Sequence, residues 1–255
     1  MSEFWSTSIS KVSPDQILVR GYPIEELARS RSFGDAVYLL LRGELPAGNE
    51  GKLVEAMLVA CIDHSLASPS VDAVRFVASA GVPLQTAVAA GVSAIGNVHG
   101  GAIEPCARLL AEAVARSSPA ADIFRQLKVR KQRLPGFGHP VHANDPRVKV
   151  LLDLAAEWKL ADDHVRVARD LEAESKQHVG KRLPMNVDGA IAALMCDMRI
   201  DPALGKAFFI IGRAPGYVAH AYEQMTHERP FKAPDYTEIT YAGPARRSVP
   251  PPRQP

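Results

Sequence analysis

Apolar residues recur every three or four positions along most of the chain, which is the spacing of one face of an α-helix. The only strand-like piece is at residues 16–20, where a small ribbon with the residues near Pro23 is expected. Because long alternating segments are missing elsewhere, the pattern predicts an all-α fold rather than a doubly wound sheet or a barrel. The apolar helical runs lie at residues 53–64, 106–113, 148–155, 191–195 and 215–225.

Two charged, loop-like segments interrupt these helices, at residues 129–145 and 175–184. They are candidate hinges between a larger body and a smaller lobe. The last ten residues, 246–255, are rich in proline and arginine, which is typical of a flexible tail.

Composition excludes several classes of protein. The chain has 255 residues, 47% hydrophobic, and a net charge of +2, with basic residues scattered among acids, so no nucleic-acid surface is predicted. The three cysteines, Cys61, Cys106 and Cys196, form no CxxC pair, which argues against a disulfide framework or a cysteine metal site. We find neither a signal peptide nor a membrane span, and the cytoplasm is the expected compartment.

The segment GNVHGGAIEP places His99 just before two glycines and a helix whose first turn contains Pro105. A helix N-terminus offers free N–H groups and a positive dipole end, which suit a developing oxyanion. A plain capping loop with an incidental histidine is the competing interpretation.

The segment LPGFGHPVHANDPR carries a glycine turn around His139, followed by Asp145 as the predicted N-cap of a helix that starts with Pro146 and Arg147. The glycines match no phosphate-loop fingerprint. His139 and His142 are three apart, but a zinc site needs further ligands, so no metal is predicted.

Two more segments place a charge beside an apolar helix. Asp188 opens the helix of MNVDGAIAALM, where an aspartate is commonly just an N-cap. Arg213, in IIGRAPGYVAHAYEQ, stands between two predicted helices; a buried ion pair or a substrate carboxylate would satisfy it. His220 is expected to be packed within the last helix.

In this order, GNVHGG, GFGHPVHANDPR, NVDGA and GRAPGYVAHAYEQ resemble the signature segments of citrate synthases and citryl-CoA lyases, and CIDHSL resembles the family's first histidine segment. The resemblance covers roughly residues 10–243. It implies an all-α citrate synthase-like fold that works as an intertwined homodimer or a higher homo-oligomer. Its domains would be a dimer-forming large domain at residues 1–103 and 193–245 and a small catalytic domain, with the CoA site, at residues 104–192.

The resemblance also implies residue roles. The family's catalytic triad falls on His99, His139 and Asp188: Asp188 as the base at the thioester α-carbon, His99 as donor to the enolate oxygen, and His139 at the oxygen of the hydroxyl-bearing carbon. The substrates would be an acyl-CoA and a dicarboxylic 2-oxo acid, with no separate cofactor. Binding of the oxo acid falls on His64, Arg147 and Arg213, besides His139, and the CoA-binding loop on Pro135, Gly136, Phe137 and Gly138.

The same triad serves synthesis and cleavage, so it cannot decide the direction. The short chain resembles citryl-CoA lyases, including the module at the end of ATP-citrate lyase, more than the longer synthases. Cleavage of citryl-CoA would then need a separate synthetase partner to make it. The alternatives are a short citrate synthase and a non-catalytic CoA-binding subunit. One departure is the missing arginine of an R-P-R segment before Tyr241, which synthases supply across the dimer; Arg229 or Lys232 are the candidate replacements.

Overall fold

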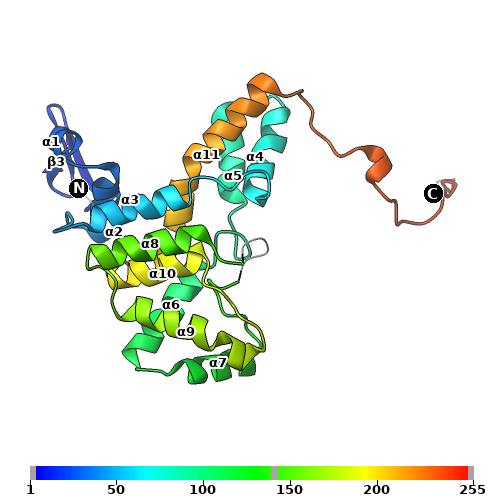
Figure 1. The fold of residues 1–255 in the computed structure, drawn as a ribbon. Coiled ribbons are helices and arrows are strands. Elements are labelled where there is room, and N and C mark those ends of the chain that lie inside the picture. The colour runs from blue at the N-terminus through cyan, green and yellow to red at the C-terminus, as the bar shows by residue number, and fades with distance from the viewer. Residues whose placement is uncertain (1–3, 139–142, 252–255) are drawn as a thin grey trace.

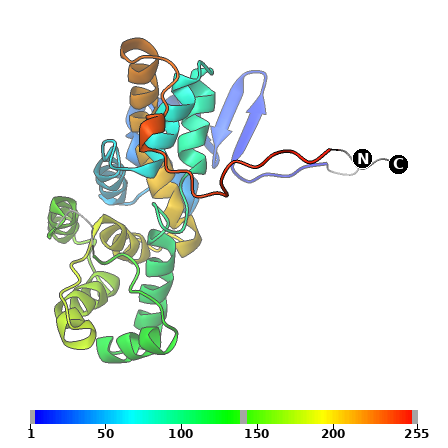
Figure 2. The ribbon, with the colours of Figure 1, turned by 90° about the vertical axis from the view of Figure 1, so that its right-hand side faces the viewer.

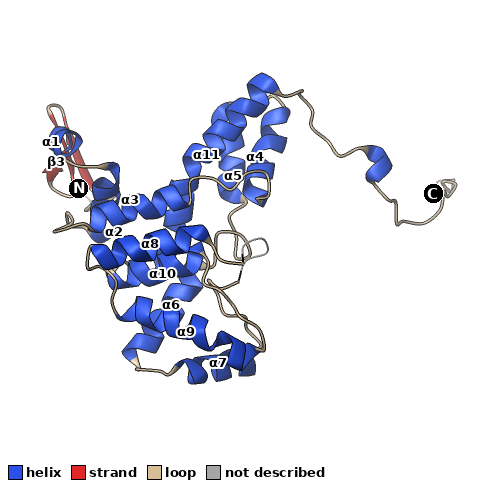
Figure 3. Cartoon of the chain, viewed as in Figure 1, coloured by secondary structure: helices blue, strands red, loops and turns tan. Residues whose placement is uncertain are grey.

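The computed structural model describes residues 4–138 and 143–251. Helices dominate it, and the predicted all-α fold is confirmed (Figure 3). A three-stranded antiparallel ribbon in the order β1-β2-β3 precedes them, and only its second and third strands were predicted. The first strand, Ser10–Ser13, is mostly exposed and carries no apolar alternation, so its sequence gives no strand signal. The strands are β1 (Ser10–Ser13), β2 (Gln16–Val19) and β3 (Tyr22–Pro23).

Eleven α-helices follow within the described residues. They are α1 (Ile24–Ser30), α2 (Phe33–Arg42), α3 (Glu50–Ala60), α4 (Pro69–Ser79), α5 (Leu84–Ser93), α6 (Ile103–Ala115), α7 (Ala120–Val129), α8 (Pro146–Glu157), α9 (Asp163–Val179), α10 (Val187–Asp197) and α11 (Gly205–His227).

Two groups of helices surround two hydrophobic cores. Helices α4 and α5 pack with the second half of α11, while α6 to α10 form the other group with α2 and α3 beside it (Figure 1). Helix α11 joins them, because Phe208 belongs to the larger core and Tyr217 to the smaller one. The segment from α5 to α6, which carries His99, runs between the groups (Figure 1). The chemistry is therefore expected where the two groups meet.

Three local predictions were wrong. Helix α3 ends at Ala60, so His64 lies in the following loop and not at the end of the helical stripe. Helix α9 continues to Val179, so the second loop is shorter than the charge pattern suggested. Pro215 lies inside α11 rather than between two helices.

The continuity of α11 has a physical cause. Pro215 cannot donate to the carbonyl of Ile211, and such a residue costs a helix about 3 kcal/mol. Both halves of α11 are nonetheless fixed by burial on their cores. A Cβ at Gly212 would lie 2.7 Å from the Leu58 carbonyl oxygen, so the helix approaches α3 too closely for any larger residue.

Residues 228–251 leave the helical body as an exposed segment, interrupted by a short 3₁₀ helix at Tyr236–Glu238 (Figures 1 and 2). It begins along α4, where the Phe231 N–H donates to the Ser79 carbonyl at 2.7 Å and the Lys232 N–H to the Ser79 hydroxyl at 3.0 Å. No helix in the described part of the chain is long and apolar enough to cross a membrane.

Candidate functional site

Asp188 lies in the first turn of α10 and is partly buried. It does not cap the helix, which was the competing interpretation of this residue. Asn186 caps the helix instead, accepting from the Gly189 N–H at 3.2 Å. No hydrogen bond joins the Asp188 carboxylate to residues 4–138 or 143–251, so within that part of the chain its position does not depend on capping the helix.

Asp145 is the N-cap of α8, as predicted. Its Oδ1 accepts from the Arg147 N–H at 3.1 Å and from Nε at 2.8 Å, and its Oδ2 accepts from a terminal nitrogen of Arg147 at 2.7 Å. The same Oδ2 accepts from the Val187 N–H at 3.1 Å, so this buried carboxylate ties the start of α8 to the start of α10, next to Asp188.

The loop 135–138 is clamped against the start of α10. The Gly136 carbonyl accepts from the Asn186 N–H at 3.1 Å, and the Asn186 side-chain amide donates to the Gly138 carbonyl at 2.7 Å. A Cβ at Gly136 would lie 2.7 Å from Gly189 Cα, and its φ is +80°, so only glycine suits this position. The predicted site residue His139 and the neighbouring His142 lie outside the described residues.

Arg213 of α11 is almost fully buried. Its Nε donates to the Cys61 carbonyl at 2.6 Å, and its guanidinium lies 4.6 Å from the centre of the Phe209 ring. Arg147 donates to the neighbouring Ala60 carbonyl at 3.4 Å. The last carbonyls of a helix have no partner within it, so the end of α3 holds both guanidiniums close together.

His99 is held by two serines from the start of α4. Its Nε2 lies 2.7 Å from the Ser70 hydroxyl and 3.4 Å from the Ser68 hydroxyl, and the two hydroxyls are 3.0 Å apart. Arg213 donates to the Ser68 hydroxyl at 3.3 Å. Arginine can only donate, so the Ser68 hydroxyl accepts from Arg213. One proton order that satisfies these contacts has Ser68 donating to Ser70 and Ser70 donating to His99 Nε2, which places the His99 hydrogen on Nδ1.

The glycines after His99 allow the backbone to approach its neighbours closely. A Cβ at Gly101 would lie 2.3 Å from the Gly96 carbonyl oxygen, and one at Gly100, with φ of +70°, would lie 2.7 Å from the Phe209 ring. Phe209 thus contacts the turn, and its ring meets the His99 ring edge to face at 5.4 Å. Helix α6 begins four residues after His99 with Pro105 in its first turn.

The pKa values of the two acids of the site are shifted in opposite directions. Burial raises the pKa of Asp188 from 3.8 to about 6; Asp145 adds to the rise, and Arg147 and Arg213 oppose it. The pKa of Asp145 is lowered because hydrogen bonds and charge from Arg147 outweigh its burial. Asp188 is therefore a carboxylate whose protonation changes near neutral pH, which suits proton transfer.

The imidazole of His99 has a pKa below its ordinary value, first because of burial and then because of the positive charges of Arg213 and His64. The neutral ring is therefore favoured. His64 lies in the loop after α3, where Asp63 accepts from the Ser65 N–H at 2.9 Å and pairs with Nε2 of His220 at 3.1 Å. His220 is thus partly buried in α11, as predicted, and it fixes this loop.

The structure brings the described site residues into one electrostatic neighbourhood. Arg213 acts on Asp188 and on His99, Arg147 acts on Asp188, and His64 acts on His99. The thiol beneath them, Cys61, is buried, and its pKa rises to about 12, mainly through burial, so it is inert at neutral pH. Across the described residues, no cluster of three or more His, Cys, Asp or Glu side chains could hold a metal ion.

Sequence reasoning missed the residues that position this site. Asn186, Ser68 and Ser70 belong to no motif read from the sequence, and Asp145 was recognised only as a helix cap. A serine pair or an asparagine is too common to stand out by residue type. Only the three-dimensional contacts, between residues 29 to 48 positions apart, identify them.

Comparison with known proteins identifies the family of this chain. The family model for the C-terminal domain of citrate synthase matches residues 3–55 and 47–233. The chain therefore belongs to the citrate synthase family. A solved structure of citryl-CoA lyase from Hydrogenobacter thermophilus is 42% identical, with a TM-score of 0.92 over 97% of this chain and 98% of that one.

Two curated relatives are also similar to this chain. A citrate/2-methylcitrate synthase of Bacillus subtilis is 30% identical over 87% of this chain and 58% of its own length. A probable ATP-citrate synthase of Dictyostelium discoideum is 27% identical over 89% of this chain and 39% of its own length. The chain thus spans only about two fifths to three fifths of these relatives.

Proposed function

We propose that this protein is a citryl-CoA lyase-like enzyme that cleaves citryl-CoA to acetyl-CoA and oxaloacetate, or runs the reverse condensation. The observation that carries the proposal is the match to the Hydrogenobacter thermophilus citryl-CoA lyase, which extends over nearly the whole of both chains. The raised pKa of Asp188 beside two arginines supports it, because this chemistry needs an acid–base group at a carbon next to a thioester.

In the cleavage direction, a base removes the proton of the citryl hydroxyl as the C–C bond breaks. The bonding electron pair passes to the thioester α-carbon and gives an enolate, while the hydroxyl-bearing carbon becomes the ketone of oxaloacetate. Protonated Asp188 then delivers its proton to that α-carbon, and acetyl-CoA is released. By resemblance, His139 is the base that takes the hydroxyl proton, and condensation reverses each step.

His99 stabilises the enolate. In the proton order in which Ser70 donates to Nε2, the Nδ1–H is the donor available to the thioester oxygen. The lowered pKa of His99 keeps the ring neutral, so it donates this hydrogen bond without transferring its proton to the oxygen.

Arg147 and Arg213 bind the carboxylates of the oxo acid, with His64 beside them. Each arginine uses some of its donors on the end of α3 and retains others for a substrate. The loop Pro135, Gly136, Phe137 and Gly138 is assigned to CoA, since its glycines let the ligand approach the backbone and Asn186 fixes its shape.

The 30% identical citrate/2-methylcitrate synthase of Bacillus subtilis favours a second candidate. In that case the protein would condense acetyl-CoA with oxaloacetate or a related 2-oxo acid and then hydrolyse the thioester. A non-catalytic CoA-binding subunit is the lesser alternative.

The proposal also covers the oligomeric state and the domains. We propose a cytoplasmic homodimer in which residues 1–103 and 193–245 form the shared domain and residues 104–192 the lobe that holds CoA. Arg229 and Lys232 are the candidates to replace the missing cross-dimer arginine. A separate synthetase would supply citryl-CoA.

The test is to incubate the purified protein with citryl-CoA, and separately with acetyl-CoA and oxaloacetate, and to follow acetyl-CoA, free CoA and citrate by mass spectrometry. Acetyl-CoA from the first mixture with little free CoA from the second is expected. Free CoA and citrate from the second mixture would identify a synthase. No product from either, with CoA still bound, would favour the non-catalytic subunit.

A further inference from the structure

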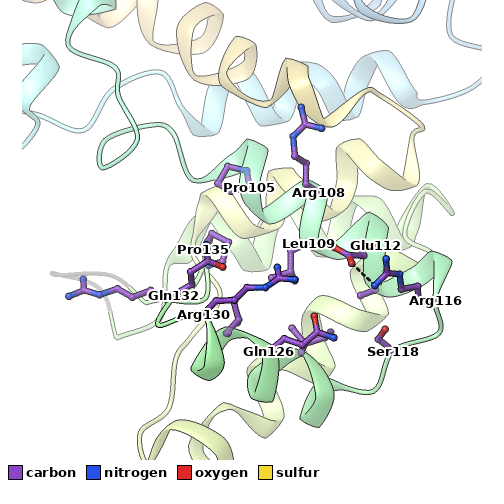
Figure 4. Close-up of a pocket in the computed structure, with 14 residues that line it drawn as sticks. Pro105, Arg108, Leu109, Glu112, Arg116, Ser118, Gln126, Arg130, Gln132 and Pro135 are labelled. Atoms are coloured by element: carbon purple, nitrogen blue, oxygen red, sulfur yellow. Dashed lines mark ion pairs between the residues drawn. The ribbon is translucent and has the colours of Figure 1, made fainter.

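The cavity between α6 and α7 is lined by four arginines and by Pro135 (Figure 4). Pro135 belongs to the loop proposed above for CoA, so this cavity is part of that proposal rather than a separate site. His220 of α11, in contrast, has no role in the function proposed so far. It contacts the loop after α3, which carries His64.

Helix α11 contacts the chain directly after α3 at three positions of one helical face. Arg213 Nε donates to the Cys61 carbonyl at 2.6 Å. At Gly216, a Cβ would collide with the next carbonyl along that chain, so the two backbones are in close contact there. His220 Nε2 lies 3.1 Å from Oδ1 of Asp63. Because residues three and four apart share a helix face, these contacts align the loop along α11.

The loop itself is strained at Ser65. Its φ is +56°, in the left-handed region that residues other than glycine rarely adopt. Asp63 stabilises this turn, because its Oδ2 accepts from the Ser65 N–H at 2.9 Å. One carboxylate therefore holds Ser65 with one oxygen and His220 with the other, and His64 lies between Asp63 and Ser65 in the chain.

The contact with Asp63 fixes the His220 imidazole. Burial raises the pKa of Asp63, but hydrogen bonds from the Ser65 and His64 N–H groups and the charge of His220 lower it more, so the pKa lies below 3.8. The carboxylate can only accept, so His220 Nε2 carries the hydrogen between them. Nδ1 is buried and has no hydrogen-bond partner within residues 4–138 and 143–251. In that part of the chain, Asp63 is therefore the one polar partner of the ring.

His220 acts on the site through this loop. Burial, Arg213 and His64 lower the pKa of His99, so His64 lies near the ring that is proposed to meet the thioester. In the described part of the chain, His220 is not among the groups that shift the pKa of His99 or of Asp188. A substitution at His220 is therefore expected to move His64 and to leave the other charges of the site in place.

We propose that His220 is a positioning residue of the active site. Through Asp63 it holds the loop after α3 in the conformation that presents His64 to the oxo acid, and it does not contact the substrate itself. The inference rests on the function proposed above, in which His64 binds the oxo acid.

Calorimetric titration of the full chain with oxaloacetate, and separately with CoA, tests this role. His220→Ala removes the charge-assisted contact and should weaken oxaloacetate binding about tenfold, while the affinity for CoA changes less than about twofold. In the condensation reaction the KM for oxaloacetate should rise with the turnover number nearly unchanged. The matched control is His227→Ala, an exposed histidine at the end of the same helix, which should bind both ligands as the wild type does.

Two amide variants separate positioning from packing. His220→Gln places an N–H where Nε2 stood and should restore oxaloacetate affinity to within about threefold of the wild type. His220→Asn carries the same amide on a shorter side chain, which corresponds to Nδ1 and does not reach Asp63, so it should behave like His220→Ala. Three results would overturn the proposal: unchanged oxaloacetate affinity in His220→Ala, equal affinities in the two amide variants, or an equal loss of CoA affinity.

Amide hydrogen exchange at Ser65 keeps this test independent of the proposed function. Exchange should be faster in His220→Ala than in the wild type and slow again in His220→Gln, because the Asp63 carboxylate is held only when a donor faces it. If the wild type binds no oxaloacetate, the proposed function fails, and this exchange decides the role of His220 by itself. Exchange that is unchanged in His220→Ala would then overturn it.

Discussion

The N-termini of α8 and α10 each carry an aspartate, and the two have opposite properties. Asp145 is buried, caps its helix, and accepts four hydrogen bonds, two of them from the Arg147 side chain. Asp188 lies in the first turn of α10 without capping it, and burial raises its pKa while that of Asp145 is lowered. The same residue type thus has a lowered pKa where its hydrogen-bond partners are built in, and a raised pKa where burial dominates.

The largest effect is expected from Asp188→Asn, which keeps the shape of the side chain but cannot carry the proton. Turnover of citryl-CoA should fall about 10²- to 10⁴-fold, the usual worth of a positioned acid or base. Product formation followed by mass spectrometry measures this loss. Asp153→Asn, an exposed aspartate of α8 paired with Lys149, is the control and should retain full activity. Activity within about threefold of wild type would contradict the assignment of Asp188.

The second prediction concerns Asp145, whose loss should act on stability. Arg147→Gln removes the side-chain partner of a buried carboxylate and should lower the free energy of unfolding by about 3 kcal/mol. The double variant Asp145→Asn/Arg147→Gln should recover part of that loss, because no buried charge is then left unpaired. Urea denaturation of the two variants measures both effects. A double variant that is less stable than Arg147→Gln alone would refute the role of Asp145 as a partnered structural anion.

The third prediction uses pH to separate the two acids. A carboxyl whose pKa is raised on folding binds its proton more tightly in the folded state. Ionisation of Asp188 therefore lowers the free energy of unfolding; this loss is absent below about pH 4 and complete above about pH 6. Asp188→Asn should therefore be more stable than the wild type at pH 7, by up to about 3 kcal/mol, and the difference should vanish at pH 4.

Asp145 has the opposite sign. Because its pKa is lowered on folding, Asp145 stabilises the folded state above pH 3.8, the pKa of the unfolded chain. This stabilisation is lost as the pH falls through the lower pKa of the folded state. Asp145→Asn should therefore be less stable than the wild type at pH 7, with the difference shrinking in acid. Thermal unfolding from pH 3 to pH 7 measures both variants, and the same sign for both at pH 7 would contradict the comparison.

The two acids also show which features of the fold and the site could be predicted from the sequence. Helical periodicity predicted the fold class because most helices bury one apolar face, and the caps Asp145 and Pro146 marked the start of α8 correctly. Pro215 was misjudged because local propensity predicts a break, whereas burial on two cores keeps α11 continuous. The competing interpretation of Asp188 as a cap was wrong because Asn186, two residues earlier, also satisfies the capping rule and caps the helix.

The sequence could not predict the pKa difference at all. That difference arises because burial raises the pKa of Asp188, whereas the hydrogen bonds and charge of Arg147 lower the pKa of Asp145. Nor could it predict the hydroxyl relay, because Ser70 precedes His99 by 29 positions. Contacts of this kind depend on how helices pack, and residue spacing carries no signal for them.

The smallest effect is expected at that relay. Ser70→Ala removes the donor to His99 Nε2, so the ring can place its hydrogen on either nitrogen and only part of the population presents Nδ1–H to the thioester. The turnover number should fall about tenfold, with the KM for the CoA thioester nearly unchanged, because the contact strengthens only as the enolate forms.

Ser79→Ala is the matched control for this prediction. Ser79 is a buried serine of the same helix whose hydroxyl donates to the Phe76 carbonyl, so a purely structural effect of losing a hydroxyl from α4 should appear there as well. Nitrogen-15 NMR of the His99 ring provides the decisive signature, with a single Nδ1–H tautomer in the wild type and a mixture in Ser70→Ala. An unchanged tautomer with the same loss of turnover in both serine variants would leave Ser70 as a packing residue. A changed tautomer confined to Ser70→Ala would show that the neutral imidazole owes its orientation to Arg213, acting through two hydroxyls.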